Sequence, residues 1–161
     1  MSQPISVLFV CTGNICRSPT AQGIFEQLVG AAHLQQRFEI DSAGISNYHV
    51  GEAPDPRTQK AAAAHGVDLS QQKARQIQVR DFYEYDLIVA MDSGHLDELQ
   101  EQKPDDARSE LIRLLDYCDE IAHKDVPDPY YGSNVGFDRV FEICDAGCRA
   151  LLQRLRVDFG R

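Results

Sequence analysis

The segment ISVLFVCTGNICRSP, residues 5–19, passes from an apolar run through a polar loop into the start of a helix. Residues 5–10 are almost wholly apolar, which is typical of a strand buried in a parallel sheet. Beyond residue 19, apolar side chains recur at steps of three and four, as on the core-facing side of a helix; they are Ala21, Ile24, Phe25, Leu28 and Val29. The segment therefore predicts a strand, a loop and a helix, in that order.

The rest of the chain repeats this alternation. Residues 38–43, 87–91 and, less distinctly, 110–115 predict three further strands. Helices are predicted after Asp55 and Asp92, which are suited to capping a helix N-terminus, and along a C-terminal apolar stripe; the stripe comprises Val140, Phe141, Cys144, Cys148, Leu151, Leu152 and Leu155. Residues 119–132, with two prolines, predict a loop. We expect one α/β domain over residues 1–161: a doubly wound, Rossmann-like or flavodoxin-like sheet of about four parallel strands flanked by helices.

Composition excludes several classes of partner. The chain has 161 residues, 43% of them hydrophobic, and its 16 Lys and Arg against 25 Asp and Glu give a net charge of −9. Such acidity opposes binding to duplex nucleic acid and to anionic membranes, because both depend on Lys and Arg. With 8% aromatic residues and no Trp, a large platform for stacking single-stranded bases is not expected either.

The cysteines and the N-terminal residues indicate a cytoplasmic setting. Residues 1–4 lack the pattern of a secretory signal, and no stretch approaches the ~20 apolar residues of a membrane span. The five cysteines are an odd number without the density of a secreted disulfide framework. We therefore expect a protein of the reducing cytoplasm, with no membrane partner, in which some cysteines serve chemistry.

The loop after the first strand has the composition of an anion site. Doubly wound sheets bind ligands at the carboxyl ends of their strands. This loop lacks both nucleotide-binding glycine patterns, but it carries Cys11 at the strand end and Arg17 six positions later. Gly13 and Asn14 tolerate positive φ, and a helix is expected to begin near Ser18. Inward-facing amides, a helix N-terminus and a guanidinium together predict a cradle shaped for phosphate.

Cys11 is the candidate nucleophile of this cradle. Positive potential favours a thiolate, and a thiolate facing a phosphate ester is placed for in-line attack. Arg17 would hold two phosphate oxygens in the transition state, and Ser18 could donate a hydrogen bond to the sulfur. The alternative is that Cys11 merely ends a buried strand, as free cysteines often do.

Residues 11–19, CTGNICRSP, resemble the signature of the low-molecular-weight protein tyrosine phosphatases. The resemblance covers nearly the whole chain and includes the motifs DSAG at 41–44, KARQI at 73–77, AMD at 90–92 and DPYYG at 128–132. It implies hydrolysis of tyrosine-phosphorylated proteins and aryl phosphates, without metal or other cofactor, through a phosphocysteine on Cys11. It further implies that Arg17 binds phosphate, that Asn14 and Ser18 hold the loop, and that Asp128 is the general acid. Inorganic phosphate and other oxyanions are the implied ligands, and members of the family are commonly monomers.

A carboxyl group in the role of Asp128 is also required by the chemistry. A phenolate leaves more easily when it is protonated, and water must later be activated to release phosphate from Cys11. One carboxyl group can serve as acid and then as base, contributing about 10²–10⁴-fold. The alternative for Asp128 is an ordinary turn former, because Asp-Pro begins many turns.

The remaining candidates are substrate-binding residues, most of them implied by the resemblance. The loop residues in this group are Thr12, Gly13, Asn14, Ile15, Cys16 and Ser18. Tyr48, Tyr130 and Tyr131 are aromatic side chains suited to stacking on a phenyl phosphate. The alternatives are loop packing for Ile15, Tyr130 and Tyr131 and a surface-loop position for Tyr48. The resemblance also implies that Tyr130 and Tyr131 can themselves be phosphorylated.

The other cysteines and the histidines have separate interpretations. The resemblance implies a reversible disulfide between Cys16 and Cys11, the alternative being a small side chain packed beneath the loop. Cys144 and Cys148 are expected in the buried stripe of the last helix rather than in a four-cysteine zinc site with the loop. The five histidines show no metal-ligand spacing, and we expect them to be structural or surface residues. Gln72 stands where eukaryotic-type members often carry His, and a network of Gln72 with Ser42 and Asn14 is the expected substitute.

Two other functions share this loop. A thioredoxin-coupled arsenate reductase needs additional resolving cysteines, and residues 45–117 contain no cysteine. A non-catalytic phosphotyrosine-binding module would be indicated by the loss of Cys11, Arg17 or Asp128, and all three are present.

Overall fold

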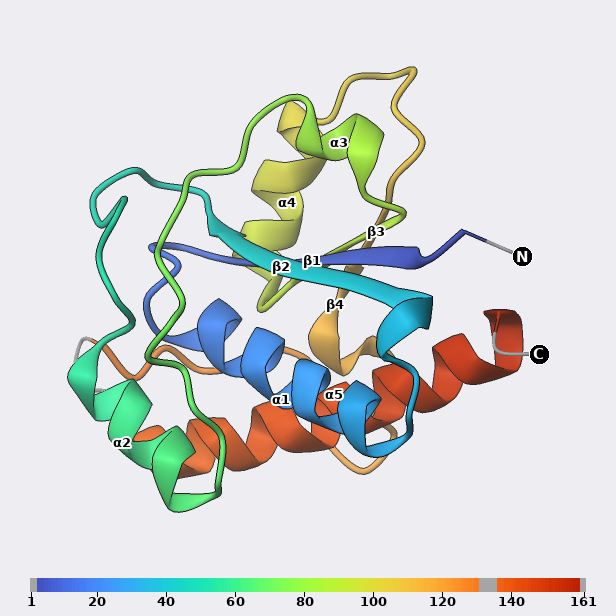
Figure 1. Ribbon diagram of the computed structural model, residues 1–161. Helices are drawn as coiled ribbons and strands as arrows, with labels where there is room; N and C mark the ends of the chain where they lie inside the picture. The colour runs from blue at the N-terminus through green and yellow to red at the C-terminus, as the bar shows by residue number, and fades with distance from the viewer. Residues whose placement is uncertain (1–2, 131–135, 160–161) are drawn as a thin grey trace.

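Four parallel strands form the centre of the computed structural model, which describes residues 3–130 and 136–159 (Figure 1). In chain order they are β1 (Ile5–Cys11), β2 (Phe38–Gly44), β3 (Leu87–Ala90) and β4 (Glu110–Arg113). Their order across the sheet is β2-β1-β3-β4, and the register pairs Cys11 with Gly44 and Val10 with Ala90. Because β1 pairs with β2 on one side and β3 on the other, the strand order reverses at β1, where such sheets bind ligands.

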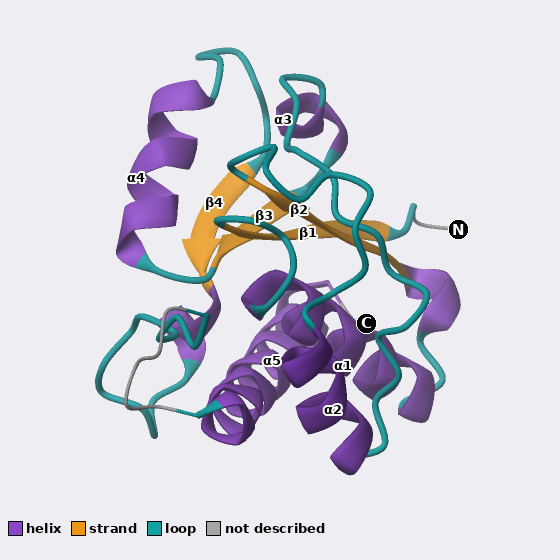
Figure 2. Ribbon diagram, turned by 90° about the vertical axis from the view of Figure 1, so that its left-hand side faces the viewer, coloured by secondary structure: helices purple, strands orange, loops and turns teal. Residues whose placement is uncertain are grey.

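Helices cover both faces of the sheet (Figure 2). α1 (Arg17–Ala31) and α5 (Phe137–Phe159) pack together on one face, with α2 (Pro56–Ala64) against α5. α3 (Asp81–Glu84) and α4 (Ser93–Gln102) lie on the other face, and two short 3₁₀ helices occupy Gln35–Arg37 and Leu114–Tyr117. The predicted doubly wound α/β fold is confirmed. No helix in residues 3–130 and 136–159 is long and apolar enough to cross a membrane.

Alternating side chains of β1 enter the two cores. Val7, Phe9 and Cys11 belong to the core beneath α1 and α5, whereas Leu8 and Val10 belong to the core beneath α3 and α4. Burial of each large apolar side chain contributes about 1.5–3 kcal/mol. The same alternation directs Cys11 to the face from which α1 leaves the sheet.

The predicted helix caps are confirmed, and some boundaries shift. Asp55 Oδ1 accepts a hydrogen bond from the Arg57 amide, and Asp92 Oδ1 accepts one from the His95 amide, each at 2.8 Å. Helix α1 begins at Arg17, slightly earlier than predicted, and the fourth strand ends at Arg113, where Leu114 starts a 3₁₀ turn. α3 was not predicted, because four residues carry too little periodicity to be recognised.

Candidate active site

The loop after β1 curls around the start of α1 and faces the loop after β3. The left-handed residue that bends it is Asn14, with a φ of 59°. Gly13 has no positive φ; it lies close to the His49 side chain, since a Cβ there would be 2.9 Å from His49 Cδ2. The prediction of positive φ is therefore confirmed for Asn14 and wrong for Gly13.

The Asn14 side chain fixes this bend from three sides. Its Nδ2 donates to Ser18 Oγ at 2.8 Å and to Ser42 Oγ at 2.9 Å, and its Oδ1 accepts from the Arg75 amide at 3.0 Å. Asn14 is 3% exposed, so these bonds are shielded from competing water. The DSAG and KARQI motifs thus meet the signature loop through one asparagine.

Gly44 allows β2 to approach the signature loop closely. A Cβ at Gly44 would lie 2.9 Å from the Thr12 carbonyl oxygen and 3.1 Å from the Asn14 nitrogen. The amides of Ile45 and Ser46 donate to the carbonyls of Cys11 and Thr12, each at 2.9 Å. The loop is therefore fastened along the end of β2.

Asn14 and Ser42 are bonded to each other as expected, but the prediction that Gln72 joins them was wrong. Ser42 Oγ donates instead to Gln22 Oε1 of α1, at 2.6 Å. Gln72 Nε2 donates to the Pro19 carbonyl at 3.0 Å. Gln22, on the first turns of α1, is therefore the glutamine bonded to Ser42, whereas Gln72 is bonded to the backbone of α1 at Pro19.

Cys11 lies at the bottom of the loop, 3% exposed, with Sγ 3.0 Å from Ser18 Oγ. Ser18 Oγ accepts from Asn14, so its own proton is available to the sulfur or to the Ala43 carbonyl, which is more distant at 3.5 Å. A hydroxyl in this position stabilises a thiolate by donating to it. The positive end of the α1 dipole also faces the Cys11 sulfur. No acidic residue in the first turn of α1 offsets it.

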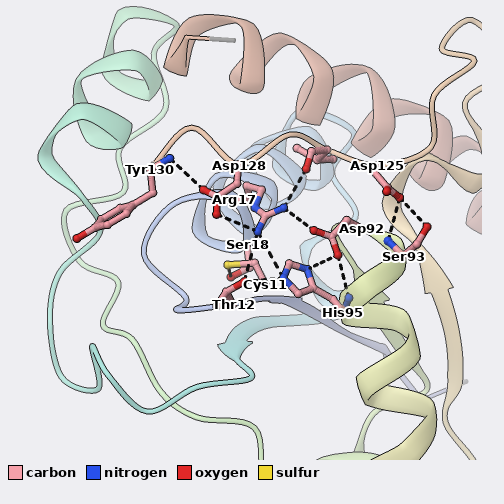
Figure 3. A network of polar contacts seen from close by, with 11 residues as sticks. Cys11, Thr12, Arg17, Ser18, Asp92, Ser93, His95, Asp125, Asp128 and Tyr130 are labelled. Carbon is pink, nitrogen blue, oxygen red and sulfur yellow. Dashed lines mark hydrogen bonds and ion pairs between the residues drawn. The ribbon is translucent and has the colours of Figure 1, made fainter. Parts of the chain in front are cut away.

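The two terminal nitrogens of Arg17 differ in their contacts: Nη1 makes two short hydrogen bonds, whereas the contacts of Nη2 are longer (Figure 3). Nη1 donates to Asp92 Oδ2 at 2.7 Å and to the Val126 carbonyl at 2.9 Å. Nη2 is 3.4 Å from Thr12 Oγ1 and 3.5 Å from Asp128 Oδ2. Nη1 thus anchors the guanidinium, and Nη2 is the nitrogen available to an incoming anion.

The charges around Arg17 keep it protonated. Burial acts to lower the pKa of Arg17, but the facing Cys11, Asp92 and Asp128 outweigh it and raise the pKa above its ordinary value. Burial likewise acts to raise the pKa of Asp92, but the hydrogen bonds from His95 and Arg17 hold that pKa below its ordinary value. The pair is therefore fully ionised.

Asp128 reaches the site on the loop before α5. Its Oδ1 accepts from the Tyr130 amide at 2.9 Å, as a turn-forming aspartate does, while Oδ2 faces Arg17. The loop is anchored by Val126, whose amide donates to the Met91 carbonyl at 2.9 Å, and by Asp125, which accepts from the amide and hydroxyl of Ser93. The two interpretations of Asp128 are compatible, because each uses a different carboxylate oxygen.

These residues surround a cavity of about 100 Å³, a volume suited to a small anion. Most of the predicted substrate-binding residues line it, together with two that sequence reasoning missed, Ser46 and His49. The full lining is Cys11, Thr12, Gly13, Ile15, Cys16, Arg17, Ser46, Tyr48, His49, Asp128 and Tyr130. Asn14 and Ser18 support the loop without lining the cavity, and Tyr131 lies outside the described residues. Ser46 and His49 could have been found from their place just after β2, at the same sheet edge.

Part of the cavity wall is apolar and aromatic. Ile15 and Cys16 pack against Ala74, with Tyr130 beside them. The Arg57 guanidinium lies 5.4 Å from the centre of the Tyr130 ring. Tyr48 is 85% exposed and stands at the rim.

The remaining cysteines are buried. Burial raises the pKa of Cys16 to about 12 and that of Cys144 to about 12. Cys144 and Cys148 are 0% exposed on α5, which confirms their place in its buried stripe. In the described part of the chain, no three His, Cys, Asp or Glu side chains are grouped so that they could hold a metal ion.

Asp92 and His95 were not among the predicted site residues. His95 Nε2 lies 2.7 Å from Thr12 Oγ1 and 3.4 Å from Arg17 Nη2. The signal available in the sequence was their spacing of three on a predicted helix that begins at the carboxyl end of β3, which the topology brings next to β1.

Comparison with known proteins assigns the family. Residues 6–160 match the model of the family described as low molecular weight phosphotyrosine protein phosphatase. The chain is 40% identical over 152 residues to the low molecular weight protein-tyrosine-phosphatase YfkJ of Bacillus subtilis, covering 94% of this chain and 96% of the relative. The crystal structure of YfkJ aligns over 98% of both chains with a TM-score of 0.92 at 38% identity.

Two other solved structures bear on ligands. Wzb of Vibrio vulnificus, in complex with benzylphosphonate, aligns over 94% of this chain and 99% of its own with a TM-score of 0.80 at 28% identity. The Drosophila arginine phosphatase DARP aligns over 93% of this chain and 97% of its own with a TM-score of 0.86 at 32% identity. The chain belongs to the low molecular weight phosphotyrosine protein phosphatase family, and the family prediction is confirmed.

Proposed function

We propose that this protein hydrolyses phosphotyrosine in proteins, and aryl phosphates, through a phosphocysteine formed on Cys11. The observation that carries the proposal is the meeting of the Cys11 sulfur, the weakly engaged Nη2 of Arg17 and the Asp128 carboxylate around one small cavity. A phosphoryl group there would contact a nucleophile, a fixed cation and a proton donor together.

The reaction has two displacements at phosphorus. In the first, Cys11 Sγ attacks phosphorus, the bond to the tyrosine oxygen breaks, and Asp128 gives that oxygen a proton. In the second, water attacks the phosphocysteine, Asp128 takes a proton from the water, and the Cys11 thiolate leaves as inorganic phosphate is released. Arg17 holds the equatorial oxygens in both steps, and Ser18 stabilises the thiolate as nucleophile and as leaving group.

The cavity walls favour an aryl ester. Ile15 and Tyr130 provide apolar and aromatic surface beside the phosphate position, and exposed Tyr48 can stack on a phenyl ring. Wzb binds benzylphosphonate, which carries the same combination of ring and phosphorus oxyanion. Because DARP is an arginine phosphatase of the same fold, phosphoarginine is the substrate against which selectivity should be measured.

The arsenate reductase alternative has little support. Cys118, Cys144 and Cys148, which lie outside the signature loop, are at most 2% exposed. A resolving thiol must reach both the active site and an external reductant, and these cysteines are packed in the core.

The phosphocysteine itself is the test of the proposal. Acid quenching during the first turnover of p-nitrophenyl phosphate is expected to trap one phosphoryl group on the peptide that contains Cys11, as detected by mass spectrometry. A phosphoryl group on another residue, or hydrolysis with no trapped intermediate at any quench time, would contradict the covalent mechanism.

We further propose that Cys16 protects Cys11 from irreversible oxidation. Peroxide converts the Cys11 thiolate to a sulfenic acid, and the Cys16 sulfur then attacks it, loses its proton and releases water as the disulfide forms. The pKa of about 12 keeps Cys16 a thiol, so that peroxide reacts first at Cys11. An added thiol reduces the disulfide and restores the enzyme.

Cys16→Ser is therefore expected to lose activity to peroxide irreversibly. The measurement is activity after brief peroxide treatment followed by excess thiol, where the wild type should recover most activity and Cys16→Ser several-fold less. Cys118→Ser, which removes a buried cysteine outside the loop, is the matched control and should recover like the wild type. Equal recovery of Cys16→Ser and the wild type would count against Cys16 as the partner.

The setting of the enzyme follows from the same features. A reactive thiol and an acidic chain are suited to the reducing cytoplasm, to phosphoproteins rather than nucleic acid, and to inorganic phosphate or similar oxyanions as competing ligands. The proposed working form is a monomer whose single phosphatase domain spans residues 1–161. We also propose that phosphorylation of Tyr130 or Tyr131 regulates the enzyme.

A further inference from the structure

Two side chains of the signature loop and two from the start of α4 form a closed ring (Figure 3). Arg17 Nη1 donates to Asp92 Oδ2 at 2.7 Å, and Asp92 Oδ1 lies 3.3 Å from His95 Nδ1. His95 Nε2 lies 2.7 Å from Thr12 Oγ1, which in turn lies 3.4 Å from Arg17 Nη2. Both ends of the guanidinium are thereby connected to the same aspartate and histidine, which come from the start of α4.

The surroundings of His95 select one tautomer. Nδ1 is buried, faces the Asp92 carboxylate and has no hydrogen-bond partner of good geometry among the described residues. A proton on Nδ1 is attracted by that carboxylate, whereas a lone pair there would be repelled. Nε2 therefore carries the lone pair and accepts from the Thr12 hydroxyl, with Arg17 Nη2 as a second donor at 3.4 Å.

We infer that His95 is a positioning residue for phosphate binding: as a neutral acceptor it fixes the Thr12 hydroxyl and directs Nη2 of Arg17 into the cavity. This inference rests on the proposed function. It adds a residue of α4, outside the signature loop, to the groups that determine how tightly a phosphoryl group is held.

The surroundings of His95 keep its imidazole neutral, so that Nε2 remains a hydrogen-bond acceptor. Arg17 faces it with a positive charge, while Asp92, Asp125 and Asp128 face it with negative ones. Burial, reinforced by Arg17, lowers the pKa of His95 to about 4, although the three carboxylates act in the opposite direction. At assay pH values of 6 and above, His95 is therefore neutral.

The direct check is the tautomer in the wild-type protein. Imidazole ¹⁵N NMR at neutral pH is expected to show His95 with a protonated Nδ1 and an unprotonated Nε2. A protonated Nε2 would overturn the inference, because it could not accept from Thr12 and would point a donor at Arg17. This measurement needs no variant and no catalytic activity.

Two variants separate the hydrogen bonding of the His95 nitrogens from the packing of its ring. His95→Phe keeps a buried ring but removes both nitrogens, whereas His95→Gln returns an acceptor near the position of Nε2. We expect His95→Phe to raise the inhibition constant of inorganic phosphate and the KM for p-nitrophenyl phosphate about 10-fold, since the Thr12 hydroxyl and Arg17 Nη2 both lose an acceptor. His95→Gln should restore most of this affinity.

A matched variant controls for a weakened α4. Leu96→Ala shortens a partly buried apolar side chain on the same helix that packs on the other core. It should lower the melting temperature and leave phosphate affinity unchanged. If His95→Phe behaves like Leu96→Ala, or if His95→Gln fails to restore affinity, His95 has a structural role only and the inference is wrong.

A double variant tests the route through Thr12. If His95 acts by fixing the Thr12 hydroxyl, then adding His95→Phe to Thr12→Val should weaken phosphate binding little further. Fully additive losses would overturn that route. A wild-type protein that binds phosphate but hydrolyses no aryl phosphate would refute the proposed function. In that case the dissociation constant of inorganic phosphate, measured by calorimetry in place of the inhibition constant, still tests the role of His95.

Discussion

Cys11→Ser is expected to abolish aryl phosphate hydrolysis while inorganic phosphate still binds. A serine hydroxyl is a far weaker nucleophile and a far worse leaving group than a thiolate, so both displacements lose their reacting atom. Loss of the nucleophile costs about 10⁶-fold in kcat in a serine protease, and we expect a fall of at least about 10⁴-fold in kcat here. Phosphate affinity should remain within a few-fold of the wild type, because Arg17 and the loop amides are untouched.

The measurement pairs turnover of p-nitrophenyl phosphate with phosphate binding by calorimetry. Cys118→Ser, which removes an equally buried thiol outside the loop, should retain wild-type turnover. Substantial turnover by Cys11→Ser would mean that water attacks the ester directly. Loss of phosphate binding in the same variant would instead indicate that the loop needs the sulfur for its shape.

The prediction of the fold succeeded because its evidence is local. Residues 5–19 combine an apolar strand, a glycine-containing loop and a helix start, and the structure places β1, the loop and α1 there in that order. Asp55 and Asp92 were recognisable as helix caps because the chemistry of a cap lies within three residues. Boundaries failed where periodicity was short, as at α3 and at the end of β4.

The details of the site were harder to predict because they depend on contacts between distant segments. Asn14 receives its partners from β2 and from the segment of Arg75, and only the folded register decides that Gln22 rather than Gln72 reaches Ser42. His95 gave no metal-ligand spacing, which is the pattern by which histidines are commonly recognised. Its contact with the loop arises from the pairing of β3 with β1, which brings the start of α4 to Thr12 and Arg17.

The net charge of −9 would by itself suggest that the protein avoids phosphate. The structure shows how an acidic chain can still hold an anion: Arg17 is buried at 4% exposure with one nitrogen fixed by Asp92, and it acts at short range inside a cavity. Electrostatic interaction inside such a site is stronger than in water. We expect the surrounding acidity to oppose the approach of large polyanions rather than the binding of one phosphoryl group.

Asp128→Asn is expected to slow hydrolysis about 10²–10⁴-fold for phosphotyrosine and phenyl phosphate, and much less for esters of activated phenols. An asparagine can still accept the Tyr130 amide through Oδ1, so the turn is kept while the acidic proton is lost. A good leaving group departs without protonation, whereas a poor one does not. Asp128→Ala removes the turn bond as well and should add a loss that is the same for every leaving group.

The diagnostic measurement is kcat/KM for a series of aryl phosphates plotted against the pKa of the leaving phenol. The wild type should show a shallow slope, because Asp128 neutralises the departing oxygen, and Asp128→Asn a steep negative one. Asp119→Asn changes an exposed aspartate between the 3₁₀ turn and Asp128 and should keep the wild-type slope. Equal slopes for Asp128→Asn and the wild type would remove Asp128 from proton transfer and reduce it to the turn former that its sequence context also allows.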